Sequence, residues 1–97
     1  MVVGSLRLSL RLEGCRSLKD KRRIIRSLID RARRDFQVSV AEVGDEDLWG
    51  NAEIGVACVG NSASHVERIL QRVQEQLESC PEAEIVEVGR EVSSVEC

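Results

Sequence analysis

The alternation of leucines near the N-terminus is the feature that most narrows the possible folds. Apolar and polar residues alternate there, with Arg7, Ser9 and Arg11 standing between Leu6, Leu8, Leu10 and Leu12. This period of two is typical of a strand with one buried face. Gly14 ends the pattern, and the hydrophobic period then changes to that of a helix. The chain therefore begins with a half-buried strand followed by a helix that can cover it.

The predicted first helix begins at Ser17, and Asp20 three residues later completes a capping-box-like start. At about 100° per residue, the apolar residues of 18–34 form one continuous arc. Its members are Leu18, Ile24, Ile25, Leu28, Ile29 and Ala32. Lys21 also lies in this arc, and we expect its long side chain to extend out to solvent near the helix end.

The remaining segments follow in a regular order. Residues 36–43 and 52–60 alternate in the manner of strands, and the turn formers of 44–51 between them predict a hairpin. A second helix begins after Asn61, Ser62 or Ser64 and ends before Pro81. Residues 82–92 form a fourth strand, and we expect a frayed tail over about 91–97.

The order β-α-β-β-α-β predicts an α+β, ferredoxin-like sandwich, in which a four-stranded antiparallel sheet carries both helices on one face. The 97 residues fit one such domain, 1–97. The other face of the sheet then carries a small patch of Ala41, Ala57 and Val59, with Arg7 and Arg11 at its rim. This patch is either open to solvent or a possible interface covered by a second subunit.

The charge is divided sharply along the chain. Residues 1–34 have a net charge of +8 and residues 35–97 a net charge of −11, although the whole chain has only −3. This division predicts an anionic partner for one face, or self-association of opposite faces.

Much of the positive charge falls on one side of the predicted first helix. Lys19, Arg22, Arg23, Arg26 and Arg33 lie within about 100° of each other beside the apolar arc, and Arg16 precedes the helix. We predict that these six residues bind an anion or nucleic acid. A solvated flank that faces the protein's own acidic strands is the alternative. Since Phe36 and Trp49 are the only aromatic residues, RNA contact is expected at the backbone and not by base stacking on the sheet.

Trp49 lies in the acidic hairpin turn. We expect its ring to fold back and close one end of the core, because a large ring buries much area; an interface anchor is the alternative. The neighbouring carboxylates lack the spacing of a calcium loop. They are Glu42, Asp45, Glu46 and Asp47. No metal and no cofactor is expected.

The signals for an enzyme are weak. His65 is the only histidine, and spacing identifies no serine or cysteine partner for it. An acylphosphatase-like phosphate hydrolase would use Arg16 at the helix start with Asn51 near the third strand. That family's glycine-rich loop is missing from EGCRSLKDK.

Cys15, Cys58, Cys80 and Cys97 are scattered without a C-x-x-C pair, which indicates reduced thiols. The alternating N-terminus differs from a signal peptide, and no apolar run is long enough to cross a membrane. We expect a cytoplasmic protein with no membrane contact.

Several segments together resemble the bacterial YlxP-like family, a domain of unknown function. They are SLKDKRR, FQVSVAEV, the Asp47-Leu48-Trp49 turn and GVACV, and the resemblance runs over nearly the whole chain. It implies a ferredoxin-like fold and a tendency to form homodimers. Family genes often lie beside those for translation initiation and ribosome maturation factors, which implies, by association, a part in ribosome or RNA metabolism. Ribosomal RNA or a ribonucleoprotein is therefore the partner expected for the basic residues.

Overall fold

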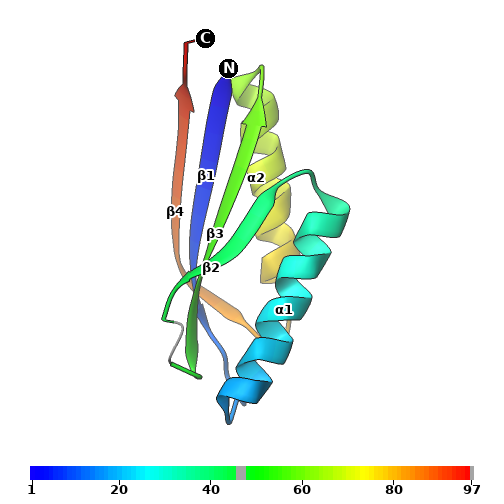
Figure 1. Ribbon diagram of the computed structural model, residues 1–97, viewed down its shortest axis with the longest axis vertical. Coiled ribbons are helices and arrows are strands. Elements are labelled where there is room, and N and C mark those ends of the chain that lie inside the picture. Colours follow the sequence, from blue (N-terminus) through cyan, green and yellow to red (C-terminus); the bar gives the residue numbers. More distant parts are fainter. Residues whose placement is uncertain (46–47, 97) are drawn as a thin grey trace.

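The computed structural model describes residues 1–45 and 48–96. Six elements follow one another along the chain: β1 (Val2–Arg11), α1 (Leu18–Asp35), β2 (Ser39–Gly44), β3 (Asn51–Gly60), α2 (Ala63–Glu78) and β4 (Glu84–Ser94). The strands form one sheet in the order β2-β3-β1-β4, and each neighbouring pair is antiparallel. Both helices lie on the same side of the sheet (Figure 1). The predicted ferredoxin-like architecture is confirmed.

The core lies between the sheet and the two helices. The inward side chains of β1 and β3 are buried, among them Leu6, Leu8, Leu10, Ile54 and Val56, as the alternation predicted. Side chains of α2 pack directly over Gly4 of β1. A Cβ atom placed there would lie only 2.4 Å from Val66 Cγ1, so this position in β1 accommodates the helix only because it lacks a side chain.

The start of α1 follows the predicted cap. Ser17 Oγ accepts a hydrogen bond from the Asp20 amide at 3.1 Å, which satisfies a helix N–H that has no backbone partner. At the other end the Phe36 amide donates to Ala32 O at 3.0 Å and closes the last helical turn. For this reason β2 begins at Ser39 and not at Phe36 as predicted.

The C-terminal end corrects another prediction. Residues 91–94, expected in a frayed tail, belong to β4, where Ser94 pairs with Val2. Beyond the strand, the Val95 amide donates to Met1 O at 2.7 Å. The segment is paired because β1 extends to Val2 and supplies partners for β4 as far as Ser94. Three residues discussed above, Glu46, Asp47 and Cys97, lie outside the described residues.

Candidate functional site

Four of the six predicted basic residues lie together on the exposed surface of α1. Lys19, Arg22, Arg23 and Arg26, here called the basic flank, are all exposed. With Asp20, Ser27 and Asp30 they line one shallow groove of about 610 Å³. The helical periodicity therefore placed these cations correctly side by side.

The basic flank has few carboxylate partners within its own chain. Arg23 Nη2 lies 3.3 Å from Glu82 Oε2, and both side chains are exposed. Among residues 1–45 and 48–96, no ion pair involves Lys19, Arg22 or Arg26. An exposed pair such as that of Arg23 contributes about 0–1 kcal/mol, so an external anion can compete for it.

Arg16 and Arg33 lie apart from this cluster. Arg16 is exposed in the loop before α1, and its backbone amide lies 3.4 Å from Asp20 Oδ2. Arg33 Nη2 donates to Val40 O at 2.6 Å. β2 is an edge strand, so this bond covers a carbonyl that another strand could otherwise pair with. Arg33 thus has a structural role which the sequence pattern did not reveal.

Lys21 is buried, and the expectation that it extends to solvent is wrong. Its side chain is 2% exposed, and Nζ donates to Leu48 O at 2.7 Å and to Asp45 O. Nζ also lies 2.9 Å from Glu42 Oε2. This contact between Lys21 Nζ and Glu42 Oε2 is an ion pair without a hydrogen bond, since Oε2 has no hydrogen-bond partner. Lys21 therefore joins the first turns of α1 to the turn between β2 and β3.

Trp49 does not close the core, and that prediction is also wrong. Its side chain is 50% exposed and that of Leu48 is 52% exposed. The turn that carries them is attached to Leu12, the residue after β1, whose amide donates to Gly50 O at 3.0 Å. Two large apolar side chains consequently face solvent at the end of the sheet.

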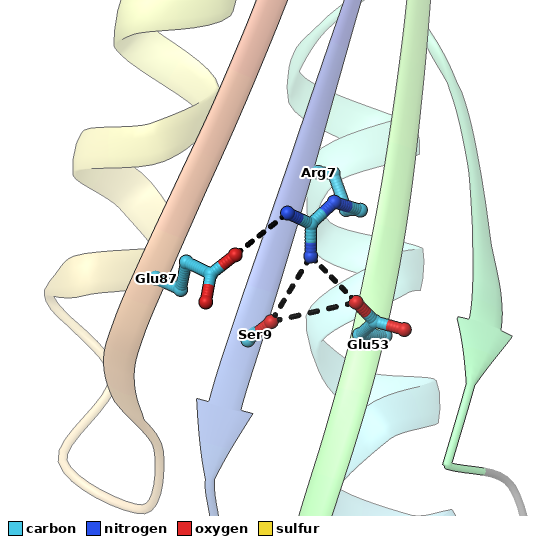
Figure 2. A network of polar contacts seen from close by, with 4 residues as sticks. All are labelled: Arg7, Ser9, Glu53 and Glu87. Atoms are coloured by element: carbon cyan, nitrogen blue, oxygen red, sulfur yellow. Dashed lines mark hydrogen bonds and ion pairs between the residues drawn. The ribbon is translucent and has the colours of Figure 1, made fainter.

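The open face of the sheet carries a polar network around Arg7. Its guanidinium lies 2.6 Å from Glu53 Oε1 on β3 and 2.7 Å from Glu87 Oε1 on β4, and Ser9 completes the group (Figure 2). The hydrogen bonds that Arg7 donates to Glu87 and Glu53 raise the pKa of Arg7 above its ordinary value. Arg7 pairs in register with Gly55 and Gly89, and this absence of neighbouring side chains leaves room for the guanidinium to spread between the strands.

Beside this network the open face forms a shallow trough of about 950 Å³. Ala41 and Ala57, two of the predicted interface residues, line it together with Val43 and Gly55. Val59, the third residue of the predicted patch, is 64% exposed at the far end of β3. The lining of the trough also includes the charged residues Arg7, Arg33, Arg90 and Glu91.

The residues of the hydrolase alternative, Arg16 and Asn51, come from different segments of the chain. Asn51 begins β3 opposite Arg11, whereas Arg16 follows β1 in the loop before α1. No hydrogen bond between Arg16 and Asn51 occurs in the described part of the chain. Burial raises the pKa of the Cys58 thiol, which makes it a poor nucleophile.

Over the ranges 1–45 and 48–96, no group of three His, Cys, Asp or Glu side chains is placed to hold a metal ion. No helix of that part of the chain has the length and apolar character needed to span a membrane.

Comparisons with known proteins agree with this fold. Two de novo designed proteins have similar structures. LFR1 1, described as having a ferredoxin fold, gives a TM-score of 0.57, and the match covers 98% of this chain and 88% of that chain. Foldit4 gives a TM-score of 0.53, and the match covers 98% of both chains. Both are 15% identical to this chain, so the likeness concerns the fold alone.

Sequence comparison identifies the family. Residues 3–90 match the model of the protein family of unknown function DUF503. The uncharacterized protein YlxP of Bacillus subtilis (strain 168) is 38% identical over 68 residues, which are 70% of this chain and 74% of that protein. The resemblance expected from SLKDKRR and the other segments is confirmed. On the evidence of both the matched segment and this relative, the chain belongs to the DUF503 family, which includes YlxP.

Proposed function

We propose that this protein is a non-enzymatic accessory module that docks on the phosphate backbone of RNA, in ribosomal RNA or a ribonucleoprotein, through the basic flank. The observation that carries the proposal is the cluster of four exposed cations on α1, three of which have no ion pair among the described residues. Adjacent like charges repel each other, and bound phosphates relieve that repulsion.

The distribution of charge over the fold supports docking on the helix side. On the open face of the sheet, the carboxylates of β3 and β4 outnumber the two arginines of β1, Arg7 and Arg11. They are Glu53, Glu84, Glu87 and Glu91. A polyanion is therefore repelled from the sheet and attracted to α1. If the four cations each meet a phosphate, log K should fall with log salt with a slope of about −3 to −4.

The test is a double charge reversal, Arg22→Glu with Arg26→Glu. We expect the affinity for ribosomal particles at low salt to fall by about tenfold or more, because two phosphate contacts become repulsive. Co-sedimentation at two salt concentrations measures this. The thermal transition should change little, since both side chains are exposed.

A matched control is available on the other helix. Arg68 and Arg72 are exposed on α2 with the same four-residue spacing, so reversing both changes the net charge equally at a different place. The double variant Arg68→Glu with Arg72→Glu should retain most of the affinity for ribosomal particles. Equal losses in the two double variants would mean that net charge and not the basic flank governs binding.

A second candidate is a homodimer formed through the open face of the sheet. The trough of about 950 Å³ and the exposed Val59 favour it, because a small-residue face allows two sheets to approach closely. A stable dimer buries about 800 Å² on each partner, and the four-stranded face is the broad surface left uncovered by the helices (Figure 1).

Sedimentation equilibrium decides this candidate. We expect a species of twice the 10.8 kDa chain mass that becomes monomeric in Ala57→Glu, since a carboxylate in the middle of the face would be buried without a partner. Ala63→Glu, at the exposed start of α2, is the control and should stay dimeric. A wild-type monomer at high concentration would exclude the dimer.

A further inference from the structure

The exposed Trp49 is costly to the isolated protein. Half of the indole faces solvent although the chain has no other tryptophan and no tyrosine, and large aromatic rings are otherwise used to build cores and interfaces. Lys21 is also buried in the fold, where it donates a hydrogen bond to the carbonyl of Leu48, the residue before Trp49. The buried Lys21 therefore stabilises a turn in which the side chain of Trp49 faces solvent.

Lys21 also determines where that ring is presented. It is followed in α1 by Arg22, a member of the basic flank, and it contacts both Glu42 at the end of β2 and Leu48. Arg22 and Arg26 in turn line a groove with Ala41 and Glu42 of β2. Figure 1 shows the start of α1, the end of β2 and the start of β3 at the same end of the molecule. The exposed indole and the first cations of the basic flank therefore share one end of the fold.

We propose that Trp49 is a stacking platform for an unpaired base of an RNA whose phosphates lie on the basic flank. This inference rests on the proposed function and adds the kind of RNA that is recognised: a loop, bulge or end whose base is available to stack. An aromatic face accepts any base, and removing such a platform weakens binding about 5- to 150-fold per base. Proteins that recognise RNA loops commonly combine stacking with backbone contacts.

The emission of Trp49 gives a direct test, because it is the only tryptophan in the chain. The full chain is titrated with an RNA hairpin that has an unpaired loop, with a blunt RNA duplex carrying the same number of phosphates, and with inorganic polyphosphate. Filter binding measures occupancy in parallel. We expect the hairpin to quench Trp49 strongly, and the duplex and polyphosphate to bind without comparable quenching.

The outcomes separate this inference from the proposed function. If the hairpin binds and the emission of Trp49 is unchanged, the stacking role is overturned while docking through the basic flank stands. Equal quenching by the blunt duplex would overturn the assignment to an unpaired base. If none of the three ligands binds, the proposed function fails and this inference fails with it.

Substitutions at the turn give a second readout. Trp49→Leu should lower the affinity for the hairpin by about tenfold and leave that for polyphosphate unchanged, because only the hairpin offers a base. Trp49→Phe should restore much of the loss. Leu48→Ala, at the adjacent half-exposed residue, should bind the hairpin almost as well as the wild type. Wild-type affinity of Trp49→Leu for the hairpin would contradict the proposal.

Discussion

Replacing Lys21 with methionine is expected to lower the free energy of unfolding by about 3 kcal/mol, the lower end of the range for removing one partner of a buried ion pair. Methionine retains most of the apolar stem but cannot donate to Asp45 O or Leu48 O. Two backbone carbonyls lose their donor, and the Glu42 carboxylate loses its only ion-pair partner among the described residues. We place the effect at the lower end because the Glu42 side chain as a whole is 25% exposed, although its Oε2 atom is buried.

Urea denaturation measures this loss. Lys19→Met, two residues earlier on the exposed flank, is the control and should change the stability by less than about 0.5 kcal/mol. Adding Glu42→Gln to Lys21→Met should recover part of the loss, because it removes the carboxylate left without a cation. Losses that simply add in the double variant would show that the two groups do not interact.

Replacing Gly4 with valine is expected to cost about 3 kcal/mol, the upper end for overpacking a core. The new Cβ would lie 2.4 Å from Val66 Cγ1 and 2.9 Å from Leu70 Cδ1, so α2 must move away from β1 or both side chains must leave their positions. Protein cores are close-packed and have little free volume to absorb such a change. The loss is measured by urea denaturation, as the decrease in the unfolding midpoint at an unchanged slope.

Gly89 offers a matched control on the opposite face of the sheet. A Cβ there would lie 3.6 Å from Arg7 Nη2, an ordinary contact, and Gly89→Val should change stability by less than about 1 kcal/mol. Combining Gly4→Val with Val66→Ala should restore part of the lost stability, because the smaller side chain leaves space for the added carbons. If Gly4→Val and Gly89→Val are equally stable, the close approach of α2 to β1 is not a constraint on the fold.

The periodicity of the sequence predicted the elements that depend on local geometry. Side chains two apart in a strand share a face, and those three or four apart in a helix share a side. The burial of Leu6, Leu8 and Leu10 followed from the first rule, and the grouping of Lys19 with Arg22 and Arg26 from the second. The open positions of Ala41, Ala57 and Val59 on the sheet were predicted in the same way.

The predictions that failed concern contacts between distant segments. Lys21 was expected in solvent because its partners Asp45 and Leu48 lie 24 and 27 residues further along the chain, beyond any helical pattern. Trp49 was expected in the core because its size favours burial, whereas the turn that holds it is attached to Lys21 and to Leu12. The end of β4 was expected to fray because nothing within 91–97 indicates that β1 extends far enough to pair with it.

The sequence by itself therefore determined the order of strands and helices, the inward face of each, and the side of α1 on which the positive charge gathers. These follow from the fixed repeats of the strand and the helix, which act over a few residues. The tertiary structure alone decided that Lys21 is buried, that Arg33 bonds to the carbonyl of Val40 on β2, and that Trp49 faces solvent. Each of these depends on hydrogen-bond partners that become neighbours only after the sheet and helices have packed together.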